Sequence, residues 1–190
     1  MTIEQIRESI LGAEWKSIAP EIRPGAIKNP DGTIKPFYLT RRFRYLPDDK
    51  FELEILNFAD PFGGTPLAKI FIRGSMLWKG EHPIATGAQK VNFIADGEYR
   101  LTPLHQGFAD AINQFAGEGF SKWVTGETQS ILKKTFPPFG LLEGRLFEEY
   151  DLLYLFENMM FWGARNIDGR GFDKEANRPT NLQIPLVRDK

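Results

Sequence analysis

The chain has 190 residues, 42% of them hydrophobic, and a formal net charge of −1. It can form one domain with an apolar core, and its balanced charge argues against a nucleic-acid binder, which usually has a basic domain. Cysteine is absent, which excludes disulfides and favours a reducing compartment. No signal-peptide core is present, and no apolar run approaches the roughly 18 residues of a membrane span. We expect a single cytoplasmic domain over residues 1–190, with no membrane span.

The N-terminal segment predicts one short helix, followed by loops. Over residues 2–11 the isoleucines fall on one helical face, and Thr2 and Gln5 have the spacing of a capping box. Residues 21–25 and 28–32 are rich in proline and glycine, a composition that predicts loops.

Residues 37–56 predict an antiparallel hairpin. In residues 37–45 and again in residues 51–55, apolar side chains alternate with polar ones, so each strand has one apolar and one polar face. The intervening sequence Leu-Pro-Asp-Asp-Lys supplies the turn. Arg41 is the exception, because it places a charge on the apolar face of its strand.

The remaining chain predicts more strands and one further helix. Asp96-Gly97 is a hairpin signal, and residues 102–117 change to an apolar period of four, which predicts an inserted helix. Residues 123–132 fit a strand or a helix, and we favour the strand. The expected strands are residues 67–78, 84–93, 99–101, 123–132, 147–156, 159–164 and, as a closing edge strand, 182–187.

Strands of this length joined by short turns favour a sandwich or an up-and-down barrel. We expect a mainly β fold, an antiparallel calycin-like or lipocalin-like β-barrel with a short N-terminal helix and one inserted helix at about 102–117. At about eight strands, the interior of such a barrel is either filled by side chains or holds one small ligand. The apolar face of the strands therefore fits both a solid core and a pocket.

Arg41 bears on that choice, because an arginine on the inward face pairs with an internal acid, lies at the barrel rim, or receives a ligand carboxylate or phosphate. Neither His82 nor His105 has a metal-site spacing, and we expect both to be ordinary surface histidines. The sequence predicts no catalytic residue, metal or cofactor. The side chains expected to line a ligand pocket are Arg41, Phe43, Phe51, Leu53, Ile55, Ile70, Ile72, Tyr154 and Phe156.

Several short motifs occur along nearly the whole chain. In order, they are Trp15, Glu21-Ile-Arg-Pro-Gly25, Leu39-Thr-Arg-Arg-Phe-Arg-Tyr45, Ile70-Phe-Ile-Arg-Gly74, Thr86-Gly-Ala, Arg178-Pro179 and Pro185-Leu186. Their order and rough spacing resemble the ectodomain repeats of the adenomatosis-polyposis-coli down-regulated (Wnt-inhibitor) family. The resemblance implies an antiparallel β-barrel-like domain with an apolar pocket, which in the animal proteins is linked to binding the lipid carried by Wnt ligands.

This chain departs from that family in ways that limit what carries over. The animal domains are secreted, rich in cysteine and occur two to a chain, whereas this chain has no cysteine. The resemblance therefore extends to a barrel with an apolar pocket and not to Wnt binding. The matched residues Arg23, Arg41, Arg44 and Arg73 would belong to the pocket or to its scaffold.

Three functions are compatible with these patterns. The first is binding of a hydrophobic small molecule, a fatty-acyl or other lipid, with Arg41 meeting its polar head. The second is a barrel isomerase, cyclase or hydrolase acting on an apolar substrate, which would need an inward acid or base such as Tyr99, Tyr154 or Asp151. The third is a structural or partner-binding domain with a solid core. The oligomeric state is left open.

Overall fold

The computed structural model describes residues 1–115 and 117–189, apart from the side chains of residues 25–28. In this part of the chain, ten antiparallel strands form one sheet, with two α-helices and two 3₁₀ helices. The strands are β1 (Glu14–Ser17), β2 (Glu21–Lys28), β3 (Ile34–Leu46), β4 (Lys50–Phe58), β5 (Pro66–Glu81), β6 (Gln89–Pro103), β7 (Gln129–Ser130), β8 (Glu148–Phe156), β9 (Met159–Trp162) and β10 (Leu186–Arg188). The helices are α1 (Ile3–Ile10), α2 (Gln106–Asn113), η1 (Pro137–Phe139) and η2 (Glu175–Asn177).

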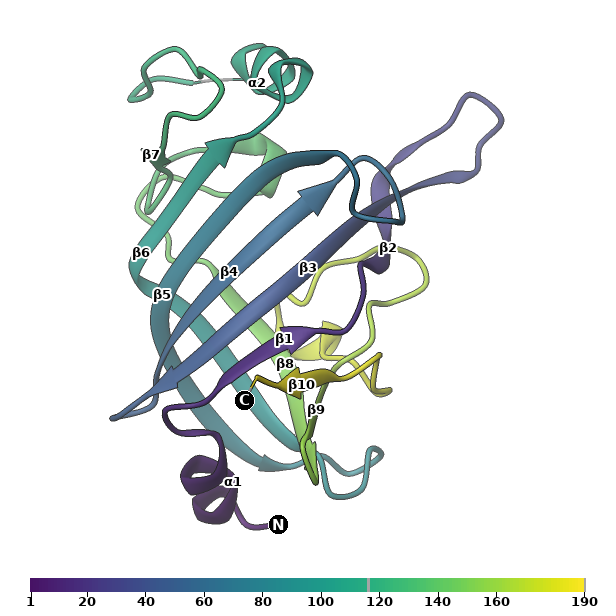
Figure 1. The fold of residues 1–190 in the computed structure, drawn as a ribbon, viewed down its shortest axis with the longest axis vertical. Helices are drawn as coiled ribbons and strands as arrows, with labels where there is room; N and C mark the ends of the chain where they lie inside the picture. The colour runs from purple at the N-terminus through teal and green to yellow at the C-terminus, as the bar shows by residue number, and fades with distance from the viewer. Residues whose placement is uncertain (116, 190) are drawn as a thin grey trace.

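Eight of these strands close into a ring. They follow the order β1, β10, β9, β8, β6, β5, β4 and β3, and β3 pairs again with β1, Phe43 lying opposite Trp15. The other two strands continue the wall. β2 lies beside β3 beyond the end of β1, and β7 lies beside β6 beyond the end of β8. Figure 1 shows β3 to β6 as one curved wall, with α1 beyond one end and α2 beyond the other.

The expected hairpin is confirmed as β3 and β4, and the predicted N-terminal helix as α1. Arg42 and Arg44 lie opposite Glu54 and Glu52 on the outer face of the hairpin, so its charges meet oppositely charged partners. Helix α1 begins with the expected capping box and buries Ile6 and Ile10 at one end of the ring. We call this the α1 end. No helix in the described ranges is long and apolar enough to cross a membrane.

The hairpin expected at Asp96-Gly97 is wrong, because β6 continues through it as one long strand. The β5–β6 register places only Gly74 opposite residues 95–97, so the extra residues form a bulge. A side chain at Gly74 would overlap the carbonyl oxygen of Ile94. Bulges bend and twist a strand, which lets β6 follow the curvature of the ring.

Other boundaries also differ from expectation. α2 is shorter than the helix expected at about 102–117, because residues 102–103 still belong to β6; residue 116 lies outside the described residues. Only two residues of the expected strand 123–132 form β7, and β10 pairs on both sides, so it is not an edge strand. β2 replaces predicted loops, since a proline is tolerated on a strand with a free edge.

Aromatic side chains fill the interior nearest the α1 end. The ring centroid of Trp162 lies 4.2 Å from that of Phe43 and 4.3 Å from that of Phe93. Phe51 meets Phe93 edge-on at 5.2 Å. These residues come from β3, β4, β6 and β9, so the contacts cross the ring and hold its walls together.

Candidate functional site

Arg41, the charge on the apolar face of the hairpin, is buried inside the ring and pairs with Glu21. Its Nε donates to Glu21 Oε1 at 2.9 Å, and its Nη2 donates to Glu21 Oε2 at 3.2 Å. Arg23 Nη2 donates to the same Oε2 atom at 3.0 Å. All three side chains are buried. We call Glu21, Arg23 and Arg41 the arginine–glutamate cluster.

Strand pairing places the cluster in the interior. β2 pairs with β3 so that Glu21 lies opposite Leu39, on the face that also carries Arg41. Because alternate residues of a strand share a face, Glu21 and Arg23 point to the same side. Ser17 links the strands further: its Oγ accepts a bond from Arg41 N at 2.9 Å and donates to Glu21 Oε1 at 3.2 Å.

The cluster rests on the aromatic interior. The guanidinium carbon of Arg41 lies 5.0 Å from the ring centroid of Trp162 and 6.0 Å from that of Phe43. Burial would raise the pKa of Glu21, but the charges of Arg41 and Arg23 outweigh it and lower this pKa. Burial and then the like charge of Arg41 lower the pKa of Arg23.

Two hydrogen-bonding groups on this side of the sheet are unused. Arg23 Nε is a buried donor without a hydrogen-bond partner, and Asn57 Oδ1 is a buried acceptor without one. Buried polar atoms in proteins are nearly always paired with protein or ordered water. The interior next to the cluster therefore has unused capacity to bind a polar group.

Asp151 is a second ionisable group on the inward face. It is 2% exposed, and its Oδ1 accepts bonds from Leu152 N at 2.7 Å and Gly163 N at 2.9 Å. Burial, followed by the nearby carboxylate of Glu149, raises the pKa of Asp151 to about 7, although the Leu152 amide and the charges of Arg41 and Arg23 oppose this. A carboxyl with this pKa can exchange a proton near neutral pH.

The inward face of β3 and β4 becomes slightly more exposed with distance from the α1 end. Along the inward face of β3, the exposed fraction rises from 0% at Phe43 to 6% at Arg41 and 7% at Leu39. Along β4, Phe51 and Leu53 are buried, whereas Ile55 is only partly buried. The ring is therefore closed by aromatic packing at the α1 end, and the inward face of β4 is partly exposed beyond Leu53, whereas Ala68 and Ile70 of the neighbouring β5 are buried.

Most residues expected to line a pocket share this inward face, but two do not. Tyr154 and Phe156 lie on the face of β8 opposite to Asp151; Tyr154 packs on Phe161, and Phe156 is 49% exposed. The prediction that Tyr154 and Phe156 line the pocket is therefore wrong. Both parities of β8 are apolar, so alternation alone could not choose the inward one. The inward residues are Arg41, Phe43, Phe51, Leu53, Ile55, Ile70 and Ile72.

The strand patterns missed Glu21 and Arg23 as interior residues, and only the family resemblance named Arg23, as pocket or scaffold. They belong to a segment whose proline and glycine predicted a loop, and the bond between Glu21 and Arg41 joins residues 20 apart in the sequence. The alternation Glu-x-Arg was the available signal, because it places two charges on one side of a strand. The expected internal acid for Arg41 is thus Glu21.

The two histidines hold turns in place. His82 Nδ1 accepts bonds from the backbone amides of Ile84 and Ala85, and His105 Nδ1 accepts one from Gly107 at the start of α2. His82 is buried, so its expected surface position was wrong; burial lowers its pKa. The Nδ1 atom of each histidine therefore holds a turn or a helix start in place.

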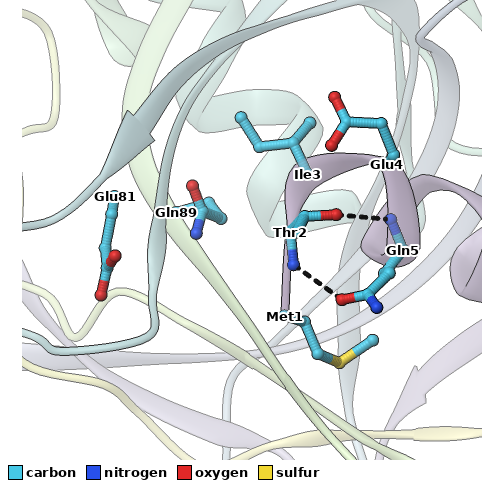
Figure 2. Close-up of a pocket in the computed structure, with 7 residues that line it drawn as sticks. All are labelled: Met1, Thr2, Ile3, Glu4, Gln5, Glu81 and Gln89. Atoms are coloured by element: carbon cyan, nitrogen blue, oxygen red, sulfur yellow. Dashed lines mark hydrogen bonds between the residues drawn. The ribbon is translucent and has the colours of Figure 1, made fainter.

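Two hollows lie outside the ring, near α1. One, of about 470 Å³, is lined by residues 1–5, Glu81 and Gln89. Figure 2 shows that its side chains include the Thr2 and Gln5 capping pair, already bonded to each other. The other, of about 260 Å³, lies between α1 and the turn at residues 46–50. Neither hollow includes any residue of the predicted lining.

The candidate site therefore consists of the arginine–glutamate cluster and the apolar wall beside it. No model of a known protein family matches this chain. The resemblance drawn from the sequence motifs stays a prediction.

Proposed function

We propose that this protein is a calycin-like barrel that binds one hydrophobic small molecule, of the fatty-acyl or lipid class, inside its ring. The observation that carries the proposal is the exposure gradient along β3 and β4. The aromatic half is closed, whereas Ile55 and Asn57, on the inward face of β4 beyond Leu53, are partly exposed. The interior of a ring of eight strands is wide enough to be filled by side chains or to hold one small ligand.

The wall near the accessible end suits an acyl chain. Leu39, Leu53, Ile55 and Ile70 share the inward face there and carry no polar side-chain atoms. Burial of each methylene group contributes about 0.8 kcal/mol, so a chain of roughly ten carbons gains up to about 8 kcal/mol before ordering costs. A ligand of this length can be held without any covalent or charged contact.

The buried charges also favour a binding role over a purely structural one. An ion pair in an interior is often no more stabilising than well-packed apolar residues of the same size. Glu21, Arg23 and Arg41 also come from two of the motifs that resemble the Wnt-inhibitor ectodomain family. On this basis we infer a single-domain relative of that family, which shares the container and not the Wnt ligand.

Native mass spectrometry of the purified protein, before and after unfolding, tests the binding function. We expect an added mass of a few hundred daltons that is released on unfolding, or uptake of added decanoate or decanol. Ile55→Trp should block the accessible wall and abolish the added mass. Leu77→Trp, on the exposed part of β5, is the matched control and should keep it. A bare wild-type mass with no uptake of either probe would contradict the proposal.

A second candidate is a barrel enzyme that acts on the same apolar molecule by proton transfer. Asp151 favours it, because it is inward-facing, buried and has a pKa of about 7. Tyr99 fits less well, since burial raises its pKa, and Tyr154 faces outward. Conversion of the bound molecule during incubation, lost in Asp151→Asn while binding persists, would favour this candidate.

A further inference from the structure

We infer that the bound molecule carries an anionic oxygen head group, and that this head binds Arg23 and not Arg41. The inference rests on the proposed function and specifies the chemical class of the ligand. A fatty acid or an acyl sulfonate would satisfy it, whereas a fatty alcohol or a hydrocarbon would not. It replaces the expectation that Arg41 meets the head.

The donors of Arg41 are already used. Its Nε and Nη2 donate to the two oxygens of Glu21, which is the forked geometry of a strong arginine–carboxylate pair. Its guanidinium also lies over the rings of Trp162 and Phe43. A ligand carboxylate could reach these donors only by displacing Glu21. Arg41 therefore holds the cluster in position.

Arg23 has the capacity that Arg41 lacks. Its bond to Glu21 uses Nη2 alone, and it shares that carboxylate oxygen with Arg41. Its Nε is buried without a partner, and the Arg23 side chain is 8% exposed. An unmade bond of this kind is costly, and an acceptor oxygen from a ligand would complete it. Arg23 Nε is thus an unpartnered donor on a side chain that Glu21 already holds in position.

The position of Arg23 fits a ligand head near the accessible end. Arg23 lies opposite Phe37, four positions farther along β3 from the α1 end than Arg41. A chain running along Leu53 and Ile70 would therefore place its head beside Arg23, away from the aromatic stack. One ligand molecule can then contact both Arg23, through its head group, and the apolar wall, through its chain.

Charge balance favours an anion at this position. Two guanidinium groups share one contacting carboxylate, which leaves the cluster with one excess positive charge. Glu149 and Asp151 are the acids whose charges also reach Arg23. Neither forms a hydrogen bond with Arg23 in the described part of the chain. Glu149 is the closest rival for this role, because it is only partly buried and can compete with a ligand anion.

The test compares decanoate and decanesulfonate with decanol, by calorimetric titration of the intact protein. We expect both anions to bind at least about tenfold more tightly than decanol, the effect of one charge-assisted bond. Arg23→Gln should remove this preference and leave decanol binding unchanged. Arg44→Gln, an exposed arginine on the outer face of β3, is the matched control and should change nothing.

Glu149→Gln provides a second, independent variant. Removing the competing carboxylate should tighten anion binding several-fold and leave decanol unaffected. An anion preference that survives in Arg23→Gln, or equal binding of anions and decanol to the wild type, would overturn the inference while keeping the container. If none of the three probes binds, the proposed function itself fails, so the two failures are distinguishable.

Discussion

Asp151→Asn should abolish a pH dependence of stability that the buried carboxyl creates. Burial raises the pKa of Asp151 from an ordinary 3.8 to about 7 in the folded protein. Between these two values the folded state binds a proton that the unfolded chain has released, so the free energy of unfolding falls as pH rises through this window. A difference of roughly three pKa units corresponds to on the order of 4 kcal/mol. This stability is present below pH 4 and lost by about pH 7.

Asparagine is a suitable replacement because its side-chain oxygen can still accept the bonds from Leu152 N and Gly163 N. The assay is urea unfolding followed by tryptophan fluorescence, at pH 5 and pH 8. The wild type should lose several kcal/mol between these values, whereas the variant should show no such loss and be the more stable at pH 8. Asp168→Asn removes an exposed carboxyl and should keep the wild-type slope. The reasoning is refuted if Asp151→Asn retains that slope too.

Two further substitutions test the packing that shapes the ring. Gly74→Ala should cost about 2–4 kcal/mol in urea unfolding, because the new methyl group would overlap the carbonyl oxygen of Ile94; Gly117→Ala, with no atom within 4 Å of the added carbon, should be near neutral. A neutral Gly74→Ala would contradict the close β5–β6 approach. Glu21→Gln should cost about 3–5 kcal/mol, since it leaves two buried guanidinium groups without their carboxylate. Glu14→Gln, which removes a surface pair, should cost less than about 1 kcal/mol, and equal losses in both variants would refute a buried cluster.

Local patterns in the sequence were enough to predict several elements. The hairpin of β3 and β4 follows from side-chain alternation, because one face of each strand must be apolar to pack against the interior. Helix α1 follows from a capping box and an apolar face of isoleucines. Most inward residues of β3, β4 and β5 were identified from the same parity. The misfit of Arg41 left a salt bridge and a ligand contact open, and the structure pairs it with Glu21.

Only the tertiary structure decided which residues meet. In β8 both parities are apolar, and closure of the ring, not alternation, selects Asp151 and rejects Tyr154 for the interior. The turn signal at Asp96-Gly97 is overruled because pairing with β5 along its length stabilises β6 more than a local turn would. The partner of Arg41 is Glu21, on a strand that sequence composition assigned to a loop. Alternation is a property of neighbouring residues, whereas these choices depend on contacts that form only when distant strands close the ring.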